Sequence, residues 1–239
     1  MKTLEYFNPF CQHITKVITG IIHVGAHDYE ERDTYLELFE QSDDDILWID
    51  AVPSSINARK TIQACCSNTT GPATLYVSNY SQCTGLLPFS TEHKEAFKNI
   101  SQTPVEVETT TLDLLIPKAD RPLKNTLVVS VNGAELQVLK GAETLLEFID
   151  FVFVRFEKLK FHDNVPSFYE LQNWMGVNGF TYTTSVPANQ HTEMMLFISL
   201  DVQEVNRQKD KEMSDMFQLM VEDYNNKNGT GITTEVYQD

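Results

Sequence analysis

Apolar and polar residues follow one another in blocks that predict alternating strands and helices. Short, nearly continuous apolar runs at 21–25, 46–50, 126–131 and 151–156 predict strands buried on both faces. Apolar residues with helical spacing follow at about 30–41, 134–148 and 167–178. Because strands alternate with helices, the pattern predicts an α/β fold with a mostly parallel, doubly wound sheet that is covered on both faces.

Several shorter segments complete this expected sheet. Strands are predicted at 61–67, 73–80 and 105–110, and a helical turn at 111–116. The segments 180–185 and 194–200 predict an antiparallel pair at one edge, and Pro53 is expected to open a helix after the second strand.

The sequence changes character after residue 200. We expect residues 1–200 to form one domain and residues 201–239 to form a C-terminal helix and a mobile tail. Scattered apolar residues between Val205 and Val221 predict one amphipathic helix that docks on the domain or on a partner, and the last residues, NNKNGTGITTEVYQD, have little to bury. Oligomeric state and attachment to a further domain stay open.

Charge and composition exclude some partners. The 18 basic and 34 acidic residues give a net charge of −16, which repels phosphate backbones and argues against nucleic acid as a substrate. No apolar stretch approaches the roughly 20 residues that span a bilayer. The start of the chain lacks a signal-peptide core, so we expect a cytoplasmic protein without membrane insertion. The four cysteines lack zinc-site spacing and are interpreted as reduced and structural.

A glycine turn and an acidic strand end predict a cofactor pocket. The first strand, in IIHVGAHDY, ends at Gly25 and Ala26, whose small size lets backbone amides approach a ligand. Asp50 ends the next strand, and an acidic residue about 20 positions after a glycine turn binds ribose hydroxyls in dinucleotide folds. A full GxGxxG signature is missing, which argues against a dinucleotide-dependent oxidoreductase but leaves other adenosine cofactors possible.

Five collinear segments carry a family resemblance over about residues 20–185. They read IIHVGAHDYEERDTY, ILWIDAVP, CTGLLPFSTEH, VEVETTTLDLL and SVNGAELQVLKGAETLL. Together they resemble the FkbM-type S-adenosylmethionine-dependent methyltransferases. The resemblance implies a Rossmann-like class I methyltransferase fold, S-adenosyl-L-methionine as cofactor, and O-methylation of a hydroxyl on a sugar or glycan acceptor.

The resemblance also implies a set of cofactor-binding residues. Gly25, Ala26, His27 and Asp28 would surround the methionine end of the cofactor, and Asp50 with Ala51 would hold its ribose. Ser67 would lie near the adenine. Glu31 is the one carboxylate of the following helix that we expect to do more than stabilise the helix end. His23, on the first strand, is more often a core residue than a ligand.

The chain departs from the family pattern at three positions. Tyr29 stands where the family usually has glycine, and its phenol would narrow the pocket, stack on the ligand or change the path of the turn. Ser130, expected beside the cofactor, and Arg155 stand where carboxylates are usual, so we predict no metal site. These departures also motivate an alternative function, a catalytically inactive methyltransferase fold that binds or scaffolds.

Candidate catalytic residues lie on three loops. A hydroxyl acceptor gains from a general base, and a neutral imidazole suits that role near pH 7. His93, in STEHKEAF, is the leading candidate, with an exposed loop histidine as the equal alternative. His162, in KFHD, and Glu157 are the next candidates. Asn132 is expected to bind the acceptor or the cofactor from a strand end.

Overall fold

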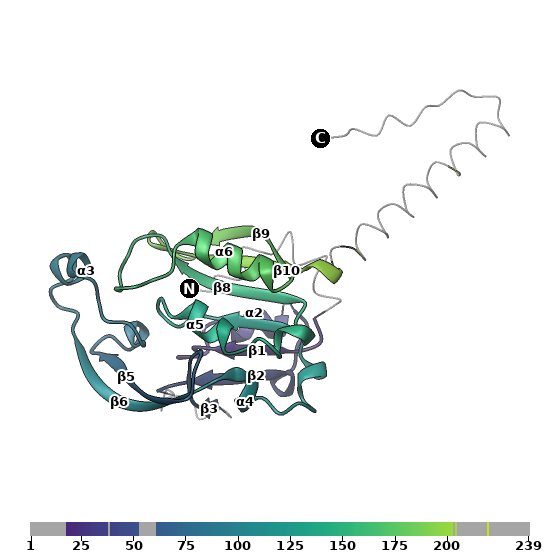
Figure 1. Ribbon diagram of the computed structural model, residues 1–239, viewed down its shortest axis with the longest axis horizontal. Coiled ribbons are helices and arrows are strands. Elements are labelled where there is room, and N and C mark those ends of the chain that lie inside the picture. Colours follow the sequence, from purple (N-terminus) through teal and green to yellow (C-terminus); the bar gives the residue numbers. More distant parts are fainter. Residues whose placement is uncertain (1–17, 38, 53–60, 203, 205–218, 220–239) are drawn as a thin grey trace, which may run out of the picture. The chain divides into compact units, whose positions relative to one another are not determined.

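The computed structural model describes residues 18–37, 39–52, 61–202, 204 and 219 (Figure 1). Contacts divide the chain into one unit that ends at Ser199 and a second that begins at Leu200. The helix expected from Pro53 and most of the amphipathic helix expected near Val205–Val221 lie outside the described residues.

The main element of the first unit is a seven-stranded sheet with the order β3-β2-β1-β7-β8-β10-β9. Neighbouring strands from β3 to β8 are parallel, and β10 runs antiparallel to both β8 and β9. This arrangement confirms the predicted mostly parallel sheet with an antiparallel edge. Its strands are β1 Ile21–Val24, β2 Ile46–Asp50, β3 Thr61–Gln63, β7 Thr126–Val129, β8 Phe151–Glu157, β9 Phe180–Pro187 and β10 Thr192–Ser199.

A second, three-stranded sheet was not expected from the sequence. It has the order β4-β6-β5 and consists of β4 Cys65–Cys66, β5 Gly71–Ser78 and β6 Gln102–Thr110. The single strand predicted at 61–67 is therefore wrong, because the chain changes sheets at Ala64. The Ala64 amide donates to the carbonyl of Asp50 at 3.0 Å, which keeps this crossover beside the end of β2.

Helices are shorter than the apolar spacing predicts. The helix expected at 30–41 covers only α2, since Tyr29 and Glu40 on either side have φ angles of 60° and 53°, outside the right-handed helical region. The helix expected at 134–148 is interrupted at Gly141, where a short turn follows α5. The α-helices are α2 Arg32–Glu37, α3 Thr91–Ala96, α4 Leu112–Leu115, α5 Glu135–Lys140 and α6 Phe168–Val177, and 3₁₀ turns cover Asp43–Asp45, Ser81–Cys83, Arg121–Leu123 and Leu146–Phe148.

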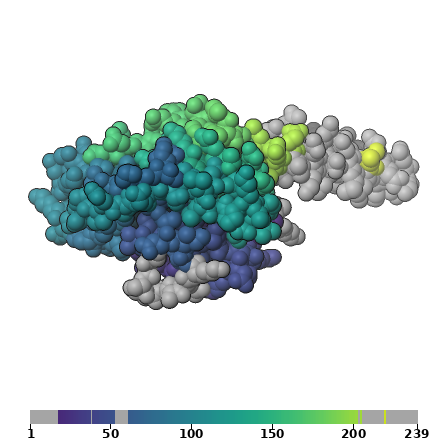
Figure 2. Space-filling model, turned by 60° about the horizontal axis from the view of Figure 1, so that its bottom comes forward, coloured from purple at the N-terminus to yellow at the C-terminus, as the bar shows by residue number. Residues whose placement is uncertain are grey.

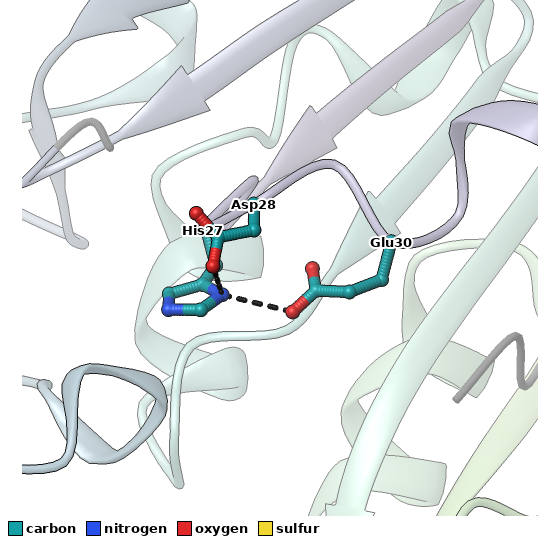
Figure 3. A group of neighbouring side chains, drawn as sticks. All are labelled: His27, Asp28 and Glu30. Atoms are coloured by element: carbon teal, nitrogen blue, oxygen red, sulfur yellow. Dashed lines mark hydrogen bonds and ion pairs between the residues drawn. The ribbon is translucent and has the colours of Figure 1, made fainter. Parts of the chain in front are cut away.

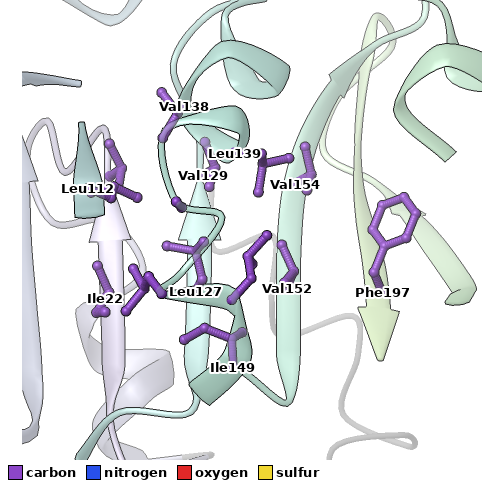
Figure 4. Close-up of a cluster of buried hydrophobic side chains, with 14 of the residues drawn as sticks. Ile22, Leu112, Leu127, Val129, Val138, Leu139, Ile149, Val152, Val154 and Phe197 are labelled. Atoms are coloured by element: carbon purple, nitrogen blue, oxygen red, sulfur yellow. The ribbon is translucent and has the colours of Figure 1, made fainter. Parts of the chain in front are cut away.

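Apolar side chains cover both faces of the large sheet. On one face, Val138 and Leu139 of α5 belong to a buried cluster with residues of β1, β7 and β8 such as Ile22, Val129 and Val154 (Figure 4). On the other face, α2 places the ring of Tyr35 against Trp48 of β2. In the space-filling view, green atoms lie at the top and purple atoms at the bottom, with teal and blue atoms between them (Figure 2).

Candidate functional site

A cavity of about 330 Å³ opens at the carboxyl ends of the parallel strands. The strand order reverses between β1 and β7, and such a switch point is where open α/β sheets bind ligands. Residues of four adjacent strands line the cavity, together with the loop after β5. They are Val24, Gly25, Asp50, Ser130 and Val131, at or just after the ends of β1, β2 and β7, and Arg155 within β8.

The turn after β1 is held tightly against its neighbours. Gly25 has a φ of 87°, and a Cβ atom there would stand 2.0 Å from the carbonyl oxygen of Ser130. The amides of Gly25 and Ala26 both donate to the carbonyl of Ile49, at 2.9 and 3.2 Å. These two amides therefore fix the turn to β2, which corrects the expectation that they are free for a ligand. Gly25 still lines the cavity, while Ala26 is buried.

Asp50 lies at the end of β2 with its carboxylate in the cavity wall. One oxygen accepts from the amide of His27 at 2.9 Å, and the other accepts from the amide of Val52 at 2.7 Å. Both bonds fix the carboxylate, and each oxygen keeps a further lone pair for a ligand. Ala51 also lines the cavity. The arrangement is suited to accepting hydrogen bonds from two neighbouring hydroxyl groups.

His27 and Glu30 form a hydrogen-bonded pair in the turn between β1 and α2 (Figure 3). His27 Nδ1 lies 2.8 Å from a Glu30 oxygen and 3.5 Å from Asp28 Oδ2, and His27 Nε2 lies 2.9 Å from the hydroxyl of Ser81. The bond to Glu30 raises the pKa of His27. Burial works to raise the pKa of Glu30, but hydrogen bonds from His27 and Gln82 help to lower it to about 2.

This hydrogen-bonded pair is part of the cavity wall. His27 and Glu30 line the cavity, whereas Asp28 does not. One ligand atom from each of His27, Asp28 and Glu30 lies within 4.8 Å of the others, close enough for one cation. The hydrogen bond between His27 and Glu30 is enough to explain why these side chains lie so close together. The absence of a metal site stays a prediction.

His23 and Glu31 are two buried polar residues of the cavity wall. His23 Nδ1 lies 2.9 Å from the hydroxyl of Tyr35. Burial, helped by the charge of Arg155, lowers the pKa of His23 to about 3, so its imidazole is neutral at physiological pH. The expected core position of His23 is confirmed by its burial, and His23 also lines the cavity.

The end of β7 supplies Ser130 and Asn132 to the same cavity. Asn132 has a φ of 56°, and its side-chain amide donates to the carbonyls of Gln82 and Thr84 at 2.9 and 2.8 Å. These bonds hold the loop after β5 over the strand ends. Buried Glu135 accepts from the amide of Val131 at 2.9 Å, and burial raises the pKa of its carboxyl to about 7.

Two further predicted cofactor residues, Tyr29 and Ser67, lie outside the cavity wall, as Ala26 and Asp28 do. Tyr29 is buried, its hydroxyl bonds to that of Thr61, and its ring meets the edge of Trp48 at 5.1 Å. The positive φ of Tyr29 thus accompanies a side chain packed in the core, so the expected narrowing of the pocket is wrong. Ser67 borders a separate surface hollow, and Cys66, one residue earlier, lines the cavity.

The three leading candidates for an acid or base lie in a separate buried cluster. His93 packs on Phe89 and Phe161, with ring centroids 4.1 and 5.1 Å away. His162 Nδ1 lies 2.5 Å from a Glu157 oxygen. None of His93, His162 and Glu157 is among the described residues that line the cavity. Burial and the neighbouring His162 lower the pKa of His93, and the geometry gives no support to a base role there.

Polar residues at the end of β5 and in the loop after it were not among the predicted site residues. Ser78 ends β5, Ser81, Gln82 and Thr84 follow it, and all four line the cavity. The segment CTGLLPFSTEH lies in this part of the chain, but imidazole chemistry makes its histidine easier to recognise as a candidate than a hydroxyl or an amide. Polar side chains just before that segment were the available signal.

The fold and the cavity define a Rossmann-like protein of the methyltransferase type, with its site at the switch point of the sheet. A family model described as the methyltransferase FkbM domain matches residues 23–210, and the chain belongs to this family. Neither curated proteins nor solved structures gave a match. Among the described residues, no helix has the length and apolar character needed to cross a membrane.

Proposed function

We propose that this protein transfers a methyl group from S-adenosylmethionine to a hydroxyl group of a sugar or glycan. The observation that carries the proposal is Asp50, which lies in the cavity wall at the end of β2, one strand away from the Gly25 turn. Membership of the FkbM methyltransferase family supports it. The sugar acceptor follows from the family resemblance.

The chemical groups of the cavity wall match the parts of the proposed cofactor. The Asp50 carboxylate would accept hydrogen bonds from the ribose hydroxyls. Half-buried Ala64 and buried Cys65 and Cys66 give an apolar wall beside β3 for the adenine. Glu30 and Glu31 bring carboxyl groups to the wall, and the negative charge of Glu30, whose pKa is lowered to about 2, favours a cation such as a sulfonium. The bound cofactor supplies a methyl group that is already activated for transfer.

The protein's own contribution is mainly alignment. Holding two reactants in the right geometry removes much of the entropic barrier to their reaction. Ser78, Ser81, Asn132 and Asn189 line the cavity and supply hydroxyl and amide groups that suit a hydroxylated acceptor. The hydrogen bonds from Asn132 to the loop after β5 would keep this wall in place.

Calorimetric titration with S-adenosylmethionine and S-adenosylhomocysteine tests the proposal. The wild type should bind both, and Asp50→Ala should weaken binding by about 10- to 100-fold, because hydrogen bonds to a charged group contribute about 1.5–3 kcal/mol. Asp44→Ala is the matched control. Asp44 is an exposed aspartate at the opposite end of β2, so its removal should leave affinity unchanged.

Each result has a direct meaning. Binding that is lost with Asp50 justifies a screen of sugars and glycans with radiolabelled cofactor. No binding by the folded wild type would contradict the proposal and favour the catalytically inactive module. Binding of a nicotinamide dinucleotide in place of S-adenosylmethionine would instead favour an oxidoreductase.

A further inference from the structure

One row of residues crosses the sheet at the mouth of the cavity. Val24 pairs with Ile49 and with Val129, and Val129 pairs with Val154. The residues that follow these four therefore lie side by side on adjacent strands, and all four line the cavity. They are Asp50, Gly25, Ser130 and Arg155. The row has the carboxylate of Asp50 at one end and the guanidinium of Arg155 at the other.

Arg155 has unused hydrogen-bonding capacity in this row. Its Nε atom is buried and has no hydrogen-bond partner. None of the ion pairs between described residues includes Arg155. Among the described residues of the cavity wall it is also the only arginine or lysine. A buried donor of a charged group without a partner is costly, so this position favours a ligand with an oxyanion.

The position of Arg155 separates it from the proposed cofactor ribose. Neighbouring strands lie about 4.8 Å apart, so Arg155 on β8 lies about 14 Å from Asp50 on β2. Met194 of β10 pairs with Arg155, and Ala188 and Asn189 line the cavity with it. A cofactor whose ribose binds Asp50 would extend over β1 and β7. The end of the cavity at β8 and β10 is then left to the acceptor.

We propose that Arg155 binds an anionic group of the acceptor, so that the substrate is an acidic hydroxyl compound. The planar guanidinium matches the two oxygens of a carboxylate, and it also matches a phosphate. This inference rests on the proposed methyl transfer, because that proposal places the cofactor at the other end of the row. Arg155 thereby selects acidic sugars over neutral ones of the same size.

Nuclear magnetic resonance of the arginine Nε–H groups tests the assignment. The Arg155 signal is identified by its absence in Arg155→Lys. Protein saturated with S-adenosylhomocysteine is titrated with glucuronate, glucose 6-phosphate and glucose. We expect glucuronate or glucose 6-phosphate to shift the Arg155 signal and to bind about 10- to 100-fold more tightly than glucose. A response to one anion alone identifies carboxylate or phosphate as the recognised group.

Two variants and two further outcomes complete the test. Arg155→Gln should remove the preference for the anionic sugar, whereas Lys158→Gln, an equal charge loss at an exposed residue just after β8, should retain it. No shift with either anion, or equal affinity for glucose, would overturn the inference. A shift caused by S-adenosylhomocysteine alone would also overturn it, because Arg155 would then hold the cofactor's carboxylate.

The failure of the proposed function can be told apart from failure of this inference. Cofactor binding is measured by calorimetry on the same samples, and the sugar titrations are repeated without S-adenosylhomocysteine. If the cofactor does not bind but anions shift Arg155, the anion site stands and the methyl transfer does not. If the cofactor binds and the anions have no effect, only the anion site is wrong.

Discussion

Two groups of polar side chains differ in burial and in what surrounds them. At the mouth of the cavity, Asp50 ends β2 and Arg155 lies within β8, and these half-buried residues both line the cavity. In the cluster of Phe89, His93 and His162, polar rings pack against aromatic rings instead. His93 Nδ1 and His162 Nε2 are buried without hydrogen-bond partners. Both groups contain residues typical of catalysis, but of these described residues it is Asp50 and Arg155 that line the cavity.

The contrast teaches that chemical type alone does not identify a site residue. Histidines drew attention in the sequence because imidazole can act as a base near pH 7. Arg155 drew attention as the loss of a carboxylate, although its guanidinium provides a new binding group in the cavity wall. Arg155 lies within β8 but level with the end of β7 and lines the cavity, whereas Glu157, which ends β8, does not. The position of a residue relative to the neighbouring strands therefore decides whether it belongs to the site.

Substitution of Gly25 is expected to have the largest effect on stability and on cofactor binding. In Gly25→Ala the new methyl group would meet the Ser130 carbonyl at 2.0 Å, at a φ that side chains rarely adopt. We expect a loss of at least about 3 kcal/mol in the free energy of unfolding and loss of S-adenosylhomocysteine binding. Urea unfolding and calorimetry measure the two quantities.

Two other glycines provide controls for that substitution. Gly141→Ala would bring a methyl group within 2.1 Å of the Ser67 carbonyl, away from the cavity, so stability should fall while the folded fraction still binds the cofactor. Gly176→Ala in α6 meets nothing within 4 Å and should stabilise by about 0.5–1 kcal/mol. Cofactor affinity lost equally in Gly25→Ala and Gly141→Ala would show that the Gly25 turn has no special link to the cavity.

Protonation of His23 is expected to have an intermediate effect on the free energy of unfolding. Its folded pKa of about 3 is below the ordinary value of 6.5, so the unfolded chain binds the extra proton first as pH falls. Stability should therefore be complete above pH 6.5 and decrease as pH falls toward 3. The contribution between pH 7 and pH 5 is about 2 kcal/mol.

The variant His23→Gln isolates this contribution, because glutamine can still form a hydrogen bond with Tyr35 but does not titrate. Urea unfolding at pH 7, 6 and 5 should show a smaller loss of stability in the variant than in the wild type. Burial also lowers the pKa of His93, which acts in the same direction and is present in both proteins. Equal losses in the two proteins would contradict a neutral, buried His23.

Local patterns in the sequence predicted the large sheet well and the second sheet poorly. The apolar runs that became β1, β2, β7 and β8 identify strands buried on both faces, and the glycine turn with Asp50 located the cavity. The pairing of β5 with β6 joins residues 71–78 to residues 102–110. No local pattern specifies such a distant pairing, so the small sheet could not be derived in this way.

The parts of the site that were missed depend on backbone geometry. The amides of Gly25 and Ala26 are used by Ile49 only because β1 and β2 pair in this register. Tyr29 packs on Trp48 because the turn has a positive φ there. The position of His93 depends on aromatic contacts to Phe161, nearly 70 residues later in the chain. These are tertiary facts, whereas the strand ends can be derived from the chain alone.

Substitution of His93 is expected to have the smallest effect on stability and turnover. It tests directly whether the aromatic cluster takes part in the reaction. In His93→Phe, the new ring would stay among Phe89, Phe97 and Phe161, and the buried nitrogen without a partner would be removed. Stability should change by no more than about 1 kcal/mol, since the loss of an unpaired polar atom offsets the tighter packing. The Ser90 hydroxyl accepts from the backbone amide of residue 93, so this bond persists.

Methyl transfer to an acceptor found in the screen gives the deciding measurement for this variant. If His93 only fills the aromatic cluster, turnover per folded molecule should stay within about twofold, because no reacting group is removed. A general base contributes about 100-fold or more. A loss of that size, with unchanged cofactor affinity, would return His93 to the site and require the cluster and the cavity to act together, since the described cavity wall does not include it.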